Sequence, residues 1–176
     1  MAYTEAELAE TIERIAKNRK VNARNKPKSK VKREIKPEHK DLQVVASPTA
    51  HNGNLAIQEI TIPIRFPSLN DYTKANRGNK FGGAGMKKEY TDAVTLFCKQ
   101  VKLNTVEKPC RIGFTWYDNA MRDPDNIAFA KKFILDGIVT AGVLPNDTWR
   151  WIKGFSDDFV KCKKVDAKVV VTIKEV

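Results

Sequence analysis

The sequence predicts a small α/β (α+β) protein in which helices pack on a mixed β-sheet, preceded by an N-terminal helix and a basic arm. Three observations predict this class. From Ala56 onward, apolar residues switch between the twofold spacing of strands and the 3.6-residue spacing of helices. Hydrophobic residues make up 41% of the chain and include eight Phe, four Tyr and three Trp, which is enough for a core. At 176 residues the chain fits one domain with an appendage better than two domains, since single domains commonly run to ~100–150 residues.

We expect two parts, a helix and flexible arm over residues 1–54 and a folded domain over residues 55–176. Thr4 and Glu7 have the spacing of a capping box, so a helix should begin there and carry a narrow apolar stripe. The stripe is formed by Leu8, Ile12 and Ile15. Residues 18–54 are polar and nearly free of aromatic residues, so they cannot bury enough surface to offset the entropy of ordering.

The positive charge is concentrated in this arm. Residues 14–36 carry eleven basic side chains and one acidic side chain, Glu34, while the whole chain has a formal net charge of +11. A segment of this charge density binds polyphosphate by releasing counterions, whatever the base sequence. A solubilising tail with no ligand is the alternative reading of the same charges.

The folded domain begins with a strand over residues 57–64 and continues through a long Gly- and Asn-rich loop over residues 67–85. Further strands are expected over residues 110–117, 148–155 and 165–176, with helices over residues 86–103 and 124–140. The helix over residues 86–103 should bury a face made of Tyr90, Ala93, Val94, Phe97 and Val101.

Composition excludes several classes of protein. No apolar run approaches the ~18–20 residues of a membrane-spanning helix, and the start of the chain lacks the features of a signal peptide, so we expect a cytoplasmic protein without a membrane partner. The three cysteines are odd in number and widely spaced, which favours neither a disulfide framework nor a zinc site. Both histidines lie outside the periodic part of the chain, so catalysis centred on histidine is not expected.

Carboxylates gather where the 124–140 helix should begin. Asp123 precedes Pro124, so it could serve only as the helix N-cap. On one continuous helix, however, Lys132 and Asp136 would fall on the same side as Asp125, although they could also be an ordinary exposed pair. The opposite side carries Ile127, Ala130, Ile134 and Ile138.

Asp147 adds another carboxylate in the turn after this helix. An oxygen-only cluster of aspartates suits hard cations such as Mg²⁺ or Mn²⁺. These cations activate water and neutralise the leaving oxygen in phosphodiester hydrolysis, and a nearby lysine can stabilise the transition state.

These residues resemble the RusA family of crossover-junction endodeoxyribonucleases of bacteria and their phages. The resemblance covers residues 57–176 and lies in Arg122-Asp123-Pro124-Asp125-Asn126, the helix exit Ala141-Gly142-Val143-Leu144, and Asp147 followed by Trp149-Arg150-Trp151-Ile152. The loop with Asn70 and Asn76-Arg77-Gly78 is similar too.

The resemblance implies metal binding by Asp123, Asp125 and Asp147 and a catalytic lysine at Lys132, with Lys131 as the competing position. We further expect Asn70, Arg77, Lys80 and Arg122 to contact DNA. The implied activity is Mg²⁺- or Mn²⁺-dependent resolution of Holliday junctions by paired cuts, performed by a homodimer on branched DNA in the bacterial cytoplasm, with a phage origin also compatible. Because a two-fold junction is best cut by a two-fold dimer, we expect the dimer interface within residues 56–176.

Two alternatives stay open. The nuclease could act on forks or flaps in place of four-way junctions. The chain could also be a non-catalytic DNA-binding protein in which the aspartates are caps and surface charges.

Overall fold

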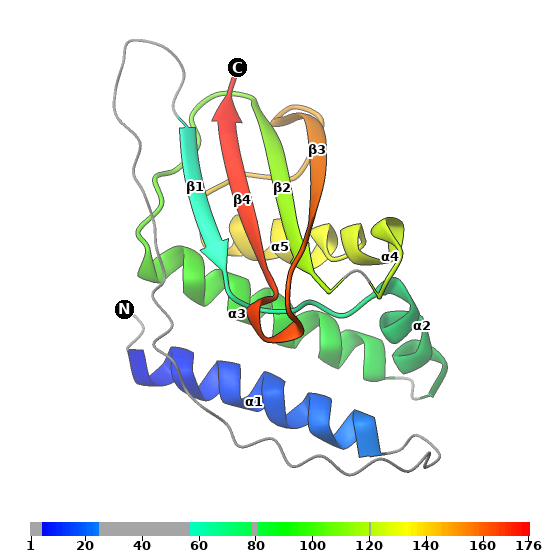
Figure 1. Ribbon diagram of the computed structural model, residues 1–176. Coiled ribbons are helices and arrows are strands. Elements are labelled where there is room, and N and C mark those ends of the chain that lie inside the picture. Colours follow the sequence, from blue (N-terminus) through cyan, green and yellow to red (C-terminus); the bar gives the residue numbers. More distant parts are fainter. Residues whose placement is uncertain (1–4, 25–56, 79–80, 120) are drawn as a thin grey trace.

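The computed structural model describes residues 5–24, 57–78, 81–119 and 121–176, and it has the predicted α+β architecture (Figure 1). The elements follow one another in the order α1 (Glu5–Arg24), β1 (Ile57–Ile62), α2 (Leu69–Gly78), α3 (Gly82–Gln100), β2 (Cys110–Asp118), α4 (Pro124–Ala128), α5 (Lys131–Thr140), β3 (Ile152–Lys161), a short 3₁₀ turn η1 (Lys164–Asp166) and β4 (Lys168–Glu175). α1 continues to Arg24, so the prediction of a flexible arm is wrong for residues 18–24, which are helical. The predicted capping residue Thr4 and the rest of the arm, residues 25–54, lie outside the described residues.

The four strands form one mixed sheet in the order β1-β4-β2-β3. β4 pairs antiparallel with both β1 and β2, whereas β2 and β3 run parallel because α4 and α5 connect them. Alternate residues of β1, β2 and β4 are buried, as expected of a sheet with one covered face. β3 is an edge strand and most of its residues are exposed.

Helices α3 and α5 lie against each other at the covered face of the sheet (Figure 1). Gly137 of α5 makes this approach possible: a Cβ atom there would lie 2.5 Å from Cβ of Val94, and Thr95 Oγ1 donates a hydrogen bond to the Gly137 carbonyl at 3.2 Å. On the other side of α3 lies α1, whose Ile15 is 4% exposed and belongs to the core. The hydrophobic positions expected on α3 and on α4–α5 are buried, apart from Val101, which is partly buried.

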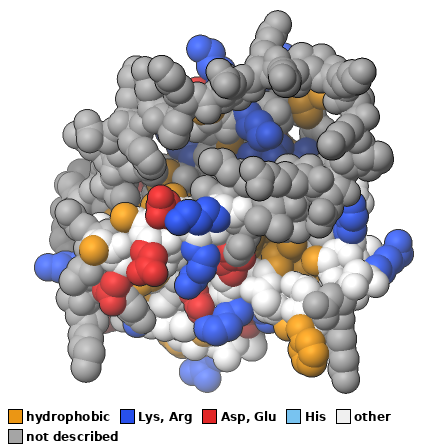
Figure 2. All heavy atoms as spheres, turned by 90° about the horizontal axis from the view of Figure 1, so that it is seen from below, with side chains coloured by type: hydrophobic (Ala, Val, Ile, Leu, Met, Phe, Trp, Pro, Cys, Tyr) orange, Lys and Arg blue, Asp and Glu red, His pale blue; other side chains and the backbone are white. Residues whose placement is uncertain are grey.

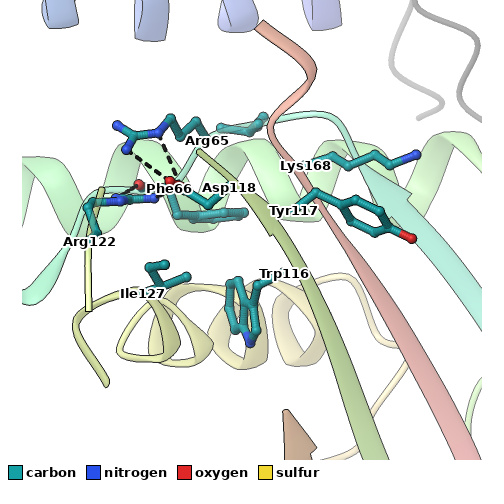
Figure 3. Close-up of a pocket in the computed structure, with 9 residues that line it drawn as sticks. Arg65, Phe66, Trp116, Tyr117, Asp118, Arg122, Ile127 and Lys168 are labelled. Carbon is teal, nitrogen blue, oxygen red and sulfur yellow. Dashed lines mark hydrogen bonds and ion pairs between the residues drawn. The ribbon is translucent and has the colours of Figure 1, made fainter. Parts of the chain in front are cut away.

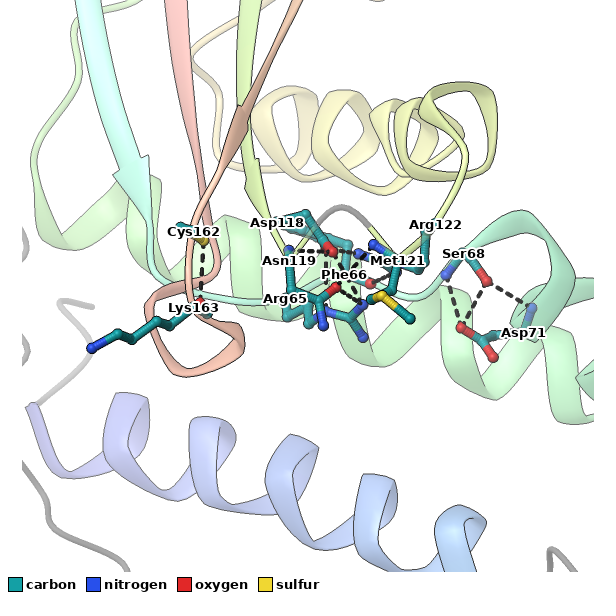
Figure 4. A network of polar contacts seen from close by, with 10 residues as sticks. All are labelled: Arg65, Phe66, Ser68, Asp71, Asp118, Asn119, Met121, Arg122, Cys162 and Lys163. Carbon is teal, nitrogen blue, oxygen red and sulfur yellow. Dashed lines mark hydrogen bonds and ion pairs between the residues drawn. The ribbon is translucent and has the colours of Figure 1, made fainter.

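The prediction of a loop over residues 67–85 is wrong, because most of this segment is helical. Ser68 and Asp71 form a capping box at the start of α2: Asp71 Oδ2 accepts hydrogen bonds from Ser68 N at 3.0 Å and from Ser68 Oγ at 2.8 Å, and Asp71 N donates to Ser68 Oγ at 3.2 Å (Figure 4). These bonds outweigh the burial of Asp71 and lower its pKa. The glycines serve a close contact, since a Cβ on Gly83 would meet the Asn76 side chain at 1.7 Å.

Other boundaries also differ from expectation, since the first strand ends at Ile62 and the last begins at Lys168, after the 3₁₀ turn. The predicted helix over residues 124–140 is two helices, because hydrogen bonds of the tighter i→i−3 type, such as Ala130 N to Ile127 O, interrupt the α-helical ladder at residues 129–130. The third strand begins at Ile152, after a turn in which Trp149 is 92% exposed, and it extends to Lys161.

Candidate active site

Asp123 and Asp125 stand at the exposed start of α4. Asp123 occupies the N-cap position, but its side chain makes no capping hydrogen bond, and its Oδ2 accepts only a long 3.4 Å bond from Asn126 Nδ2. The Asp125 side chain has no hydrogen-bond or ion-pair partner among the described residues, and only its backbone carbonyl is bonded, by Phe129 N at 3.1 Å. The sequence alternative, in which Asp123 serves to cap the helix, therefore fails for the side chain, and both carboxylates face solvent with oxygens available for a ligand.

A second group of charges joins α3, α5 and the turn after α5. Asp136 lies at its centre, where Oδ1 accepts a 2.9 Å hydrogen bond from Lys132 Nζ and Oδ2 forms a 2.9 Å ion pair with Lys87 Nζ. Lys132 Nζ also lies 3.7 Å from Asp147 Oδ2. We call Lys87, Lys132, Asp136 and Asp147 the lysine cluster.

The chain reversal after α5 brings Asp147 to this place. Gly142 has φ +79°, a conformation that favours glycine, and Val143 N reaches back to the Ile138 carbonyl at 3.2 Å. Val143 and Leu144 then insert into the core, where they are 3% and 0% exposed. The following residues return along α5, and Asp147 ends beside Lys132, fifteen positions earlier in the chain.

Asp136 and Lys132 are both charged at neutral pH. Burial disfavours the Asp136 carboxylate, but hydrogen bonds from Lys132 and Lys87 outweigh this effect and lower its pKa. The hydrogen bond to Asp136 is the main cause that raises the pKa of Lys132. Lys132 is therefore a fixed cation at neutral pH, suited to stabilising negative charge and not to accepting a proton.

Lys131, the competing position, points elsewhere. Its Nζ donates to Asp157 Oδ2 of β3 at 2.6 Å and lies 5.7 Å from the ring centroid of Phe114 and 5.5 Å from that of Phe155. Asp157 also accepts a 2.9 Å bond from the Trp116 indole. Lys131 thus ties α5 to the sheet, and Lys132 is the lysine next to Asp147.

Arg122, which directly precedes Asp123 in the chain, belongs to a buried cluster of charged side chains. Its guanidinium forms an ion pair with Asp118 and donates to the Phe66 carbonyl at 2.8 Å, while Arg65 contacts both Asp118 oxygens at 3.2 Å (Figure 3). We call Arg65, Asp118 and Arg122 the arginine cluster. Its side chains are 19%, 6% and 14% exposed, and both terminal nitrogens of Arg122 are bonded within the protein, so its expected DNA contact stays a prediction.

The arginine cluster joins three segments. Asp118 ends β2, Arg65 follows β1, and Arg122 directly precedes Asp123, so the cluster fixes the chain that leads into the two exposed aspartates (Figure 4). Burial of Asp118 disfavours its charge, but the hydrogen bonds from Arg122 and Arg65 outweigh burial and lower its pKa.

The other expected DNA contacts are dispersed. Asn70 and Arg77 are exposed on α2, and Lys80 lies outside the described residues. Seen from below, acidic and basic side chains of the described residues are interspersed over the surface (Figure 2). Most of the basic segment over residues 14–36 lies outside the described residues, so the structure leaves its contact with nucleic acid untested.

The structure brings together some of the predicted site and not all of it. Within residues 5–24, 57–78, 81–119 and 121–176, no three Asp, Glu, His or Cys side chains are grouped so that they could hold a metal ion. Asp123 and Asp125 share one helix end, whereas Asp147 lies by Lys132. The aspartates have the right chemistry for a hard cation, but the three-ligand set stays an implication of the resemblance.

Sequence reasoning missed Lys87, Arg65 and Asp118. Lys87 meets Asp136 only through the tertiary contact of α3 with α5, and nothing in its local sequence signals this. Asp118 at the end of an apolar strand, four residues before Arg122, was a usable signal for a buried ion pair.

Comparison with known proteins leaves the family open. No family model matches the chain, and no curated protein matches it. Among solved structures, the crystal structure of the HypE-HypF complex is similar over 69% of this chain and 32% of that chain, with 12% sequence identity and a TM-score of 0.31. The chain thus spans about a third of that neighbour's length, and so weak a likeness carries no argument about fold or function. No helix in the described part of the chain is long and apolar enough to cross a membrane.

Proposed function

We propose that the chain is a metal-dependent endodeoxyribonuclease that cuts branched DNA, with four-way junctions as the leading substrate. The observation that carries this proposal is the approach of Lys132 Nζ to Asp147 Oδ2 at 3.7 Å, between two residues on different segments that the RusA resemblance assigns to one site. Asp123 and Asp125 support it, since their carboxylates are exposed and free of capping bonds.

In this proposal Asp123, Asp125 and Asp147 would hold Mg²⁺ or Mn²⁺, and the bound cation would supply an activated water and neutralise the leaving oxygen. Water adds to phosphorus, the P–O bond to the 3′ oxygen breaks, and that oxygen takes up a proton. Lys132 stabilises the additional negative charge on the phosphate. The arginine cluster keeps the Asp123–Asp125 segment in place, the basic arm adds affinity for DNA independent of sequence, and a homodimer places two such sites on two equivalent strands.

The test is incubation of labelled four-way junction, fork, flap and linear duplex with the full chain in Mg²⁺, Mn²⁺ or EDTA. We expect cutting of branched DNA in either metal and none in EDTA. Asp125→Asn should abolish cutting while leaving junction binding in Ca²⁺ largely intact, because phosphate contacts remain.

Asp92→Asn is the charge-matched control, since within the described part of the chain Asp92 forms an ion pair with Lys88 alone, at 2.7 Å on the surface of α3. Absence of cutting on every substrate, or full activity of Asp125→Asn, would contradict the proposal. Preferential cutting of forks or flaps would replace the substrate and keep the enzyme class, and light scattering of the full chain tests the dimer.

A further inference from the structure

Asp136 is the only carboxylate among the described residues that the structure shows bound to lysines from two different helices. One oxygen takes Lys132 of α5 and the other takes Lys87 of α3, both at 2.9 Å. An isolated pair of residues four apart on a helix is worth little, because each long side chain must be held in one geometry. A carboxylate anchored from a second helix is different, since Lys87 fixes the group that fixes Lys132.

Burial separates the parts of this arrangement. The Asp136 side chain is 19% exposed, whereas those of Lys87 and Lys132 are 43% and 52% exposed. The carboxylate is therefore largely covered, whereas the two ammonium groups are about half exposed. Lys87 and Asp136 line a groove of about 440 Å³ together with Lys88, Thr91, Asp92 and Asp147.

Distances decide which carboxylate holds Lys132. Its ammonium group is in hydrogen-bond contact with Asp136 but 3.7 Å from Asp147. Without Asp136, the nearest anion for Lys132 would be Asp147, and the lysine would be drawn toward it. It would then occupy an oxygen that the proposed site needs for its cation.

We infer that Asp136 is a positioning residue, which, anchored by Lys87, holds the Lys132 ammonium group beside Asp147 without letting it close onto that carboxylate. This inference rests on the proposed nuclease function and adds a residue to the same site. Asp136 contacts neither DNA nor cation in it and acts through Lys132.

The inference predicts effects of opposite sign on binding and on chemistry. Asp136→Asn removes one negative charge and releases Lys87 and Lys132 from their ion pairs, so junction binding in EDTA should be unchanged or tighter, with a salt slope steeper by about one unit. The single-turnover cleavage rate in saturating Mg²⁺ should fall by roughly ten- to hundredfold, because the lysine is no longer in place. Half-maximal activity should also require more Mg²⁺, because Lys132 competes for Asp147.

Asp92→Asn is a close control. It removes the same charge from the same groove and releases Lys88, but Asp92 does not contact Lys132. Its binding in EDTA should change as in Asp136→Asn, while its cleavage rate stays within about twofold of wild type. Asp136→Glu, which keeps a carboxylate, should recover part of the lost rate.

The outcomes are separable. If the wild-type chain cuts no DNA, the proposed function fails and the inference fails with it. If wild type cuts and Asp136→Asn behaves like Asp92→Asn in rate, only the inference is overturned. Equal losses of binding and rate in Asp136→Asn would show a structural role and would also overturn it.

Discussion

The arginine cluster and the lysine cluster have the same arrangement of charges but differ in the exposure of their cations. In each, one aspartate binds two cations from different segments of the chain. Asp118 is 6% exposed and its partners are arginines, which are always charged and bind carboxylates through a planar fork. Asp136 is also largely covered, but its partners are lysines with half-exposed tips. A buried arginine pair therefore fixes the backbone, whereas half-exposed lysines keep ammonium groups accessible to a ligand.

The largest expected effect is on folding. Asp118→Asn should lower the free energy of unfolding by roughly 3–5 kcal/mol, because it leaves the buried Arg65 and Arg122 without their carboxylate. Urea unfolding followed by circular dichroism measures this. Equal stability of Asp118→Asn and Asp136→Asn would contradict the proposed difference between the two clusters.

The lysine cluster depends on the contact between α3 and α5, because this contact brings Lys87 to Asp136. Gly137→Ala should destabilise the protein by about 1–3 kcal/mol, because the new Cβ would meet Val94 at 2.5 Å and the Thr91 carbonyl at 3.0 Å. Gly85→Ala is the matched control, as its Cβ would have nothing within 4 Å. A Gly137→Ala protein as stable as Gly85→Ala would mean that the helices do not pack this closely.

Sequence predicted the sheet better than the charge clusters. Cys110 to Tyr117 was recognised because every second residue is apolar, and the structure extends this strand only by Asp118. The α2 segment was missed because its Gly and Asn content outweighed a Ser68-x-x-Asp71 capping signal that was present. The interruption after Ala128 could not be found, since both halves keep a helical pattern and the packing of Phe129 on Tyr72 is a tertiary contact.

The same limit applies to the candidate site. The helical spacing that places Lys132 and Asp136 on the same side as Asp125 assumes one continuous helix, which the structure does not have. What separates the two lysines is their partners, Asp157 for Lys131 and Asp136 with Asp147 for Lys132. Such contacts between α5, β3 and the turn after α5 are not encoded at fixed spacings.

A smaller loss of stability should follow from Asp136→Asn, about 1 kcal/mol or less, because its lysine partners are about half exposed and can be hydrated without it. The same urea titration measures it. A loss as large as that of Asp118→Asn would assign the lysine cluster to the fold and remove the distinction drawn between the two clusters.

Acid should remove the stabilisation that the Asp118 carboxylate provides. The pKa of Asp118 is lower in the folded chain than its ordinary value of 3.8, so its stabilisation is present above pH 3.8 and is lost as the pH falls through the folded value. Wild type should therefore lose stability more steeply below about pH 4 than Asp118→Asn does. Urea midpoints measured from pH 6 down to pH 2 test this, and parallel curves would contradict the charge state assigned to Asp118.

The most direct test of the proposed active site compares Lys132→Ala with Lys131→Ala. The measured quantity is the single-turnover rate at which each variant cleaves a labelled four-way junction in Mg²⁺, corrected for its folded fraction. Lys132→Ala should lose at least about a hundredfold in rate with little loss of junction affinity, because its ammonium group acts on the transition state. Lys131→Ala should lose stability through Asp157 and keep most of its rate. A silent Lys132 together with a sensitive Lys131 would contradict the assignment of the lysine cluster to the active site.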